Sequence, residues 1–241
     1  MTDHPAVQRL AGRAVRSYRT SFAVDENPLS EGGIWLNGKA DGVDWIDIIA
    51  GNGVAYGAVS RMSAAEQRVE QGNLDPEADG GSAPLGDYDD PTAVLAGYWG
   101  PDQHARARVF SRNQTEEYFQ EVELRLRSTM AAHRCSGYEV FFRCLKTESG
   151  YAEIARWNGG IGDFTSLAKL SGPQYGVQDG DLIEATVVGN VLRGFINGVQ
   201  VIEAVDDMFT EGSPGIGFNF GVGNTNVDHG LRDFEVDTYA P

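Results

Sequence analysis

Residues 181–205 read DLIEATVVGNVLRGFINGVQVIEAV, and this stretch decides the fold class. Apolar residues recur at every second position of its first two runs, at Ile183, Ala185 and Val187 and then at Leu192, Gly194 and Ile196. Gly189-Asn190 and Asn197-Gly198 separate the runs, and such pairs adopt the positive φ angles that two-residue hairpin turns require. The stretch therefore predicts three consecutive antiparallel strands with one face in a core.

The rest of the chain repeats this pattern from Tyr18 onward, with short alternating segments between clusters of Gly, Asn, Asp and Ser. Before residue 120, a helical stripe is expected only at 5–16. So many strands with one short N-terminal helix predict an all-β sandwich or barrel. We expect further strands near 18–24, 43–49, 53–58, 92–98, 105–111, 117–128, 137–145, 150–157, 163–170, 214–220 and 230–238.

The segment 117–128 alternates most regularly. Val122, Leu124 and Leu126 point one way, while the opposite face carries Glu121, Glu123, Arg125 and Arg127. We expect the apolar face to lie in the core and the charged face to be solvated, with weak pairing between opposite charges on neighbouring strands.

Charge and hydropathy narrow the classes of partner. The 241 residues include 35 acidic and 19 basic ones, for a net charge of -16, which repels phosphate backbones and anionic lipids. We therefore expect no nucleic-acid partner.

No apolar run approaches the roughly 18 residues of a membrane helix, and the N-terminus lacks the apolar core of a signal peptide. A soluble protein without membrane insertion is expected. Its location stays open, and an extracellular or a virion-associated protein would both fit.

The composition changes between Glu70 and His104, where eight acidic residues occur without Lys or Arg. We interpret 60–91 as a long acidic loop inserted into one domain at 18–241, after an N-terminal extension at 1–17. Cys135 and Cys144 lie without metal-ligand spacing around them, which indicates two buried thiols. A disulfide between them would need their strands to approach within about 6 Å.

Several segments resemble one known superfamily. SFAVDENPLSEGGIW at 21–35 is similar to the first strand and turn of laminin-G-like jelly-roll domains of bacteria and phages, within the concanavalin A-like lectin/glucanase superfamily. Further matches follow in the same order at 54–58, 99–109, 137–157, 180–205 and 214–218, and in the terminal LRDFEV. The resemblance covers nearly everything from residue 20 to 238 except the acidic loop. It implies a single jelly-roll sandwich of two antiparallel sheets, and it leaves the function open.

Catalytic residues are not evident from the sequence. The glucanases of this superfamily carry an E-x-D-x-(x)-E strand, and no such strand occurs here. Asp44 and Asp47 fall on opposite faces, and Glu121 with Glu123 fits a solvated outer strand. A lyase would need a base and cations, for which Arg143, Arg193 and Tyr151 would have to share a face, but its family motifs are also missing. We assign no catalytic residue.

A sugar-binding site requires fewer specific residues than a catalytic site, namely an aromatic surface and a few planar polar groups. Alternation places some aromatic and polar residues opposite the apolar faces of their strands, and we expect a binding face made of Phe141, Arg143, Trp157, Arg193, Phe195 and Asn219. The alternative is that these aromatic residues fill a second core layer under the acidic loop.

The resemblance also suggests a structural calcium ion between the N-terminal turn and the last strand. The matching positions are Asp25 or Glu26 with Asp233, and Asp87, Asp89 and Asp90 form a separate local cluster of acids. Three functions remain open: a noncatalytic module that binds a polysaccharide or surface glycan, a structural subunit of a phage particle or surface assembly, and a polysaccharide hydrolase or lyase. The first is our leading prediction, because the resemblance is broad while catalytic motifs are absent.

Overall fold

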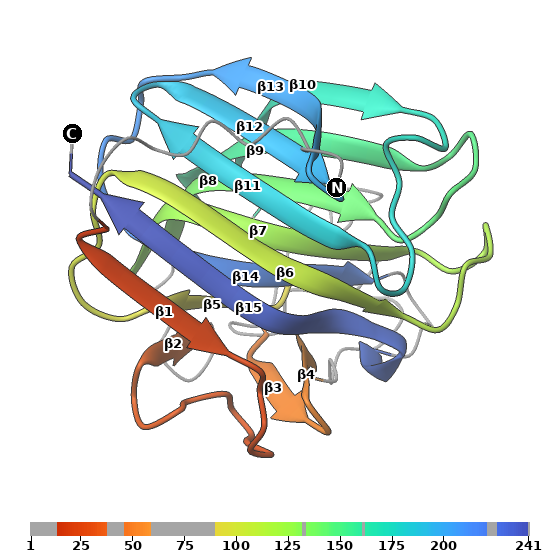
Figure 1. The fold of residues 1–241 in the computed structure, drawn as a ribbon, viewed down its shortest axis with the longest axis horizontal. Helices are drawn as coiled ribbons and strands as arrows, with labels where there is room; N and C mark the ends of the chain where they lie inside the picture. The colour runs from red at the N-terminus through yellow and green to blue at the C-terminus, as the bar shows by residue number, and fades with distance from the viewer. Residues whose placement is uncertain are drawn as a thin grey trace, which may run out of the picture.

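The computed structural model describes residues 14–37, 46–58, 90–131, 134–160, 162–220 and 226–240. These residues form two antiparallel sheets stacked face to face, as Figure 1 shows. Within them the single helical element is the 3-10 turn η2 (Asn226–Asp228). The predicted all-β jelly-roll sandwich is confirmed.

The first sheet has eight strands. Along it lie β13 (Val199–Val205), β12 (Val191–Ile196), β11 (Leu182–Val188), β6 (Asp102–Ser111), β15 (His229–Tyr239), β4 (Val54–Gly57) and β3 (Ile48–Gly51). The eighth strand, β1 (Arg16–Thr20), also pairs with β15, and Arg16 lies opposite Thr238. Strands that are distant in sequence therefore meet at the centre of this sheet.

The second sheet has seven strands, in the order β10 (Phe164–Ser171), β9 (Tyr151–Gly159), β8 (Arg134–Arg143), β7 (Gln120–Ala131), β14 (Ser213–Phe220), β5 (Thr92–Leu95) and β2 (Trp35–Asn37). The strands β7 and β14 are central. On one side of them lie the consecutive strands β8, β9 and β10, and on the other side lie the short strands β5 and β2. This sheet lies behind the first in Figure 1.

The hairpins of β11 to β13 form as the sequence predicts. Asn197 and Gly198 have φ angles of 51° and 77°, and Gly189 has one of 57°. Ile183 then lies opposite Ile196, and both side chains are buried. The alternation therefore sets the register, because a slip by one residue would turn the whole apolar set outward.

The core lies between the two sheets. Gly194 marks a place of close approach, because a Cβ there would lie 2.8 Å from Val140 of the opposite sheet. Its absence lets β12 pack directly on β8. Large fully buried side chains from both sheets fill the space, among them Leu124, Tyr138, Phe142, Phe218 and Phe234.

Several expectations need correction or lie outside the described residues. β1 begins at Arg16, so the end of the predicted helix 5–16 is a strand, and residues 1–13 are not described. The short strand β2 was not predicted. Most of the acidic loop, residues 59–89, lies outside the described residues. Cys135 and Cys144 are both buried and free. Nine residues of extended chain separate them by roughly 30 Å, too far for a disulfide.

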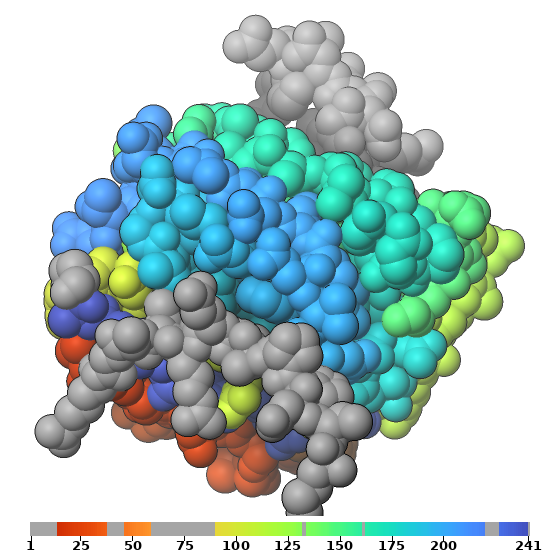
Figure 2. All heavy atoms as spheres, turned by 45° about the horizontal axis from the view of Figure 1, so that its top comes forward, coloured from red at the N-terminus to blue at the C-terminus, as the bar shows by residue number. Residues whose placement is uncertain are grey.

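The border strands β10 and β13 contact each other where the two sheets meet, and Figure 2 shows them side by side. Each of the two strands has an irregular pairing with its inner neighbour. In β10 the bulge lies between Ser166 and Ala168. In β13 it lies opposite Gly194 and Phe195 of β12. Bulged edges pair poorly with further strands. Among the described residues there is no long apolar helix of the kind that spans a bilayer.

Candidate functional site

The outer face of the seven-stranded sheet carries buried charged residues. The expectation that the charged face of β7 is solvated is wrong, because Glu121, Glu123 and Arg125 are exposed by only 5%, 2% and 1%. Alternation fixes which side chains oppose the core, but it does not say whether other parts of the chain cover them. Burial of several charges is costly unless they are paired, so the partners of these residues matter.

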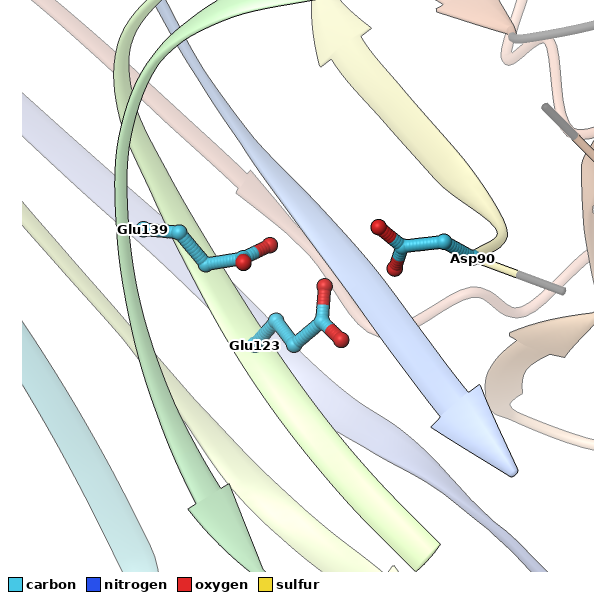
Figure 3. Close-up of side chains that lie close together, drawn as sticks. All are labelled: Asp90, Glu123 and Glu139. Carbon is cyan, nitrogen blue, oxygen red and sulfur yellow. The ribbon is translucent and has the colours of Figure 1, made fainter. Parts of the chain in front are cut away.

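Arg125 lies among three carboxylates, as Figure 3 shows for the acidic side chains. We call Asp90, Glu123, Glu139 and Arg125 the carboxylate cluster. Nη2 of Arg125 is 3.5 Å from Oδ2 of Asp90, 3.5 Å from Oε2 of Glu123 and 2.8 Å from Oε1 of Glu139. One guanidinium thus faces three acids that come from β7, β8 and the residue two positions before β5.

Gly217 on β14 makes room for this cluster. A Cβ at Gly217 would lie 2.1 Å from Oε2 of Glu123 and 3.1 Å from Nε of Arg125. The missing side chain leaves the space over β14 in which these two polar groups lie. The outward positions of β14 are Gly215, Gly217 and Asn219, and Asn219 lies opposite Glu121.

Aromatic residues border the cluster on β9 and β10. The indole N–H of Trp157 donates to Oε2 of Glu139 at 2.8 Å. The ring of Trp157 lies 5.2 Å, centroid to centroid, from that of Phe164, which is 48% exposed. The half-exposed ring of Phe164, packed against a Trp157 that is only 5% exposed, therefore lies next to a buried polar network. This combination is typical of sites that bind a polar ligand with an apolar face.

A second group of residues extends the network along β9. The hydroxyl of Tyr151 donates to Glu121, and Nζ of Lys169 lies 2.6 Å from Glu153. The same ammonium group lies 4.0 Å from the centre of the Tyr151 ring, and Phe141 packs edge-on against that ring. Phe141 and Tyr151 are 8% and 9% exposed, so their rings act mainly as packing.

Burial shifts the acids of this face toward their protonated forms. Loss of solvent raises the pKa of Glu121 well above its usual range, and the negative charges of Glu139 and Asp90 add to the effect. The pKa of Glu123 is also raised well above its usual range, first by burial and then by Asp90 and Glu139. Burial therefore favours the protonated form of two carboxyl groups at i and i+2 on β7.

The structure separates the predicted binding residues into two groups. Phe141, Arg143, Trp157 and Asn219 lie on the outer face of the seven-stranded sheet. Arg193 and Phe195 face outward from β12, on the opposite side of the sandwich, because Gly194 between them faces the core. The prediction of one shared face is wrong, since alternation within a strand does not reveal which sheet the strand joins.

Arg143 is held by the backbone of two loops. Its guanidinium donates to the carbonyl oxygens of Ser149 and Glu116 at 3.3 and 3.2 Å. Arg193 instead pairs with Glu203 on the neighbouring strand at 2.8 Å. The contacts of Arg143 fix the loops after β6 and β8.

The three acids of the carboxylate cluster could hold a metal ion, since one oxygen of each lies within 4.8 Å of the others. Nη2 of Arg125 already supplies positive charge at ion-pair distance from all three. The predicted calcium ligands lie elsewhere. Asp25 accepts the backbone N–H of Asn52 at 2.9 Å, and Oδ2 of Asp233 lies 4.0 Å from Nε of Arg108.

Sequence reasoning did not identify Glu139 or Phe164 as site residues, and it considered Asp90 only as part of an acidic run with Asp87 and Asp89. Only Glu123 and Arg125 had a local signal, their alternation with Val122 and Leu124. Asp90 reaches the cluster from a segment far from β7 in the sequence, and such convergence depends on the sheet order. The sequence places His104, His133 and His229 in or next to turns, where a histidine is usually exposed. His133 lies outside the described residues. His104 instead lies within β6 and pairs with Glu184 at 3.0 Å, and His229 is fully buried.

Comparison with known proteins supports the fold. No protein-family model matches the chain, and no curated protein sequence does either. Among solved structures, the CBM2 module of the evolved Dit protein of Lactobacillus casei BL23 phage J-1 matches with a TM-score of 0.53 and 11% identity, over 93% of this chain and 97% of that one. The chain has the jelly-roll fold of the concanavalin A-like lectins and glucanases.

Two further solved structures share this jelly-roll fold. The carbohydrate-binding module CBM66 from Bacillus subtilis has a TM-score of 0.51 and 13% identity, over 88% of this chain and 96% of that one. A β-1,3-1,4-glucanase (lichenase) derived from a mouse hindgut metagenome also has a TM-score of 0.51, with 11% identity, over 92% and 99% of the two chains. The jelly roll thus occurs in binding modules and in an enzyme, so the fold alone does not decide between them.

Proposed function

We propose that the protein binds a carbohydrate on the outer face of the seven-stranded sheet, at the border formed by Trp157 and Phe164. The observation that carries this proposal is the half-exposed ring of Phe164, which packs against the buried Trp157 beside the carboxylate cluster. A pyranose ring has an apolar face that stacks on such rings, and its hydroxyl groups bond to carboxylates and amides. Two of the solved structures that share the fold are described as carbohydrate-binding or CBM modules, which agrees with this proposal.

The proposed site departs from the predicted one in its anchor residues. Phe164 takes the place of Phe141 as the exposed aromatic group, since Phe141 is mostly covered. Asn219 is part-buried and lies at the far side of the same face, where its amide could contact a longer oligosaccharide. Arg193 and Phe195 are not part of it.

A glycan array followed by calorimetry tests the proposal. Replacement of Phe164 by Ala should weaken binding of a hit by about five- to tenfold, because stacking of one ring is worth on the order of 1 kcal/mol. Tyr98→Ala is the matched control, since Tyr98 is an aromatic residue with 70% exposure on the loop after β5. Absence of binding to any glycan at millimolar concentration would overturn the proposal.

Hydrolysis of a polysaccharide is a second candidate, favoured by Glu121 and Glu123. They lie two residues apart on a central strand, face the same way, and have pKa values raised by burial, as a general acid requires. Retaining glycosidases use two carboxyl groups about 5 Å apart. Shortened oligosaccharides in a product assay, lost in both Glu121→Gln and Glu123→Gln, would establish this activity.

We also propose a calcium ion near Asp25 and Asp233. Support comes from the pairing of β1 with β15, in which Thr20 lies opposite Phe234. Asp25 comes after Thr20 in the sequence and Asp233 comes directly before Phe234, so both exposed acids are close in sequence to the same end of this pairing. Chelation should then lower the melting temperature, and added calcium should restore it. Asp233→Asn should abolish the response. A melting curve that does not change in chelator would contradict this proposal.

A further inference from the structure

The two outermost strands of the seven-stranded sheet differ in how far their outward residues are covered. Those of β9 are all at most 9% exposed, namely Tyr151, Glu153, Ala155 and Trp157. Their partners on β10 are all exposed, namely Ser171, Lys169, Ser166 and Phe164. We call these four residues of β10 the β10 row, and Figure 2 shows β10 at the surface beside β13. A ligand on this border of the sheet therefore meets the β10 row first.

A β-bulge decides which residues of β10 belong to this row. Strict alternation after Ser166 would bring Ala168 and Leu170 to the outer face. The pairing instead shifts between Ser166 and Ala168, so that Lys169 lies opposite Glu153. Bulges often redirect a side chain next to a functional site. Here the bulge brings the one charged residue of β10 onto the same face as Phe164.

The ammonium group of Lys169 is held by two buried residues. Its Nζ lies 2.6 Å from Oε2 of Glu153 and 4.0 Å from the centre of the Tyr151 ring. Its side chain is nevertheless 48% exposed. An ammonium group has three N–H donors, so beside its bond to Glu153 it has donors left for a ligand. Because the group is already oriented, little side-chain freedom is lost when a ligand binds.

The register fixes the distance between the aromatic and the cationic end of the row. Phe164 lies opposite Trp157 and Lys169 lies opposite Glu153, and these four residues of β9 span about 13 Å. Ser166 and its partner Ala155 lie between the two ends, and both have short side chains. Neither one pyranose ring nor two linked rings cover this distance. The shortest oligosaccharide that contacts both ends therefore has three residues.

The charges at the Lys169 end favour an uncharged sugar. Lys169 and Glu153 form a pair without net charge, and Glu153 is 5% exposed. A carboxylate or sulfate group attracted to Lys169 would also approach the carboxylate of Glu153, and repulsion between like charges is strong where water is scarce. A hydroxyl or amide oxygen accepts a hydrogen bond from Lys169 without this repulsion. The net charge of -16 acts in the same direction.

We infer that the β10 row binds three consecutive residues of a linear, uncharged polysaccharide. One ring stacks on Phe164, and an oxygen two residues further along accepts a hydrogen bond from Lys169. Asp163 before the row and Ser171 at its end are both exposed, so the sugar chain can continue in both directions. This inference rests on the proposed carbohydrate binding and adds the length and the charge of the ligand.

Calorimetry with oligosaccharides of one to six residues tests the inference. The uncharged probes are the series from cellulose, laminarin, chitin and mannan, and oligogalacturonides are the charged counterpart. For at least one uncharged series we expect the affinity to rise about tenfold from two residues to three and then to stay constant, as one added hydrogen bond to a charged group would give. Equal affinities for two and three residues, or tightest binding of an oligogalacturonide, would overturn the inference.

Lys169→Met keeps the length of the side chain and removes its donors. It should weaken binding of the trisaccharide about tenfold and leave that of the disaccharide unchanged, whereas Phe164→Ala should weaken both. Arg193→Met is the matched control, because Arg193 is a partly exposed cation paired with a glutamate on the opposite side of the sandwich. Equal losses for the two sugars in Lys169→Met would contradict the position assigned to Lys169.

Ser166→Leu tests the same row without removing the partner of the buried Glu153. Ser166 is exposed, so the substitution should leave the melting temperature nearly unchanged. The larger side chain would lie between the two ends and should weaken binding of the trisaccharide more than that of the disaccharide. An unchanged trisaccharide affinity in this variant would overturn the inference even if Lys169→Met does not fold.

The outcomes separate this inference from the proposed function. A hit on the glycan array without any gain between two and three residues, or without binding of any of the four uncharged series, would retain carbohydrate binding and reject the β10 row as its extended site. Absence of binding to the array and to every series would reject carbohydrate binding itself.

Discussion

Trp157 and Glu139 are joined by a hydrogen bond of 2.8 Å between neighbouring strands, diagonally across the ladder in which Glu139 lies opposite Ala155. The bond fixes the indole ring of Trp157, and this ring packs against the half-exposed ring of Phe164. The exposed ring of Phe164 thus packs against an indole that is already fixed, so a ligand that stacks on Phe164 has less freedom to remove, which favours affinity.

The inward alternation of β12 predicts a large difference between two aliphatic truncations. Leu192 is fully buried, so Leu192→Ala should lower the free energy of unfolding by about 2 to 5 kcal/mol. Val199 is 64% exposed, and Val199→Ala should change it by less than about 0.5 kcal/mol. Urea denaturation measures both, and equal small effects would reject the register. Glu184, although it points outward, is buried against His104 and would be an unsuitable control.

A single methyl group at Gly217 should disturb the carboxylate cluster. Gly217→Ala places a Cβ 2.1 Å from Glu123, so we expect a loss of about 1 to 3 kcal/mol in stability and weaker glycan binding. At Gly160 the nearest atom to an added Cβ is 3.8 Å away, and Gly160→Ala should be well tolerated. Similar melting temperatures for both variants would contradict this prediction, because they would show that the residues around Gly217 can shift to accept a methyl group.

Truncation of Phe141 should act on folding before it acts on binding. Its ring is 8% exposed and packs edge-on against Tyr151. We expect Phe141→Ala to cost about 3 to 5 kcal/mol in chemical denaturation, whereas Phe164→Ala should cost much less. A stable Phe141→Ala variant that has lost only its affinity would instead restore Phe141 as a ligand contact.

His229 should remain neutral in the folded protein until the solution is quite acidic. Its burial lowers its pKa to about 4, although backbone hydrogen bonds oppose the shift. The unfolded chain takes up this proton near pH 6.5, so stability should fall as pH drops from there toward about 4. NMR titration of the ring would measure this directly, and a midpoint near 6.5 for His229 would contradict it.

The sequence predicted the strands well where local chemistry decides them. Asn197-Gly198 and Gly189 require hairpin turns, and alternation then places Ile183 and Leu192 in the core. β2 was missed because three residues, WLN, offer too short a pattern to detect.

The candidate site was predicted only in part, because its residues meet through the sheet order. The run from Glu121 to Arg127 has the same alternation whether its outer face meets water or other parts of the chain. Arg193 and Arg143 satisfy the same rule of opposing an apolar face, yet they lie on opposite sides of the sandwich. Periodicity along one strand carries no information on which strands become its neighbours.

The pairing of β1 with β15 has a practical consequence for protein engineering. Because Arg16 lies opposite Thr238, the chain enters and leaves the sandwich through adjacent hydrogen-bonded strands. A domain with neighbouring entry and exit points can be grafted into a surface loop of a host protein without stretching either. The sandwich is thus suited to serve as an inserted cassette, with the Trp157 face carried on the sheet to which neither of these two strands belongs.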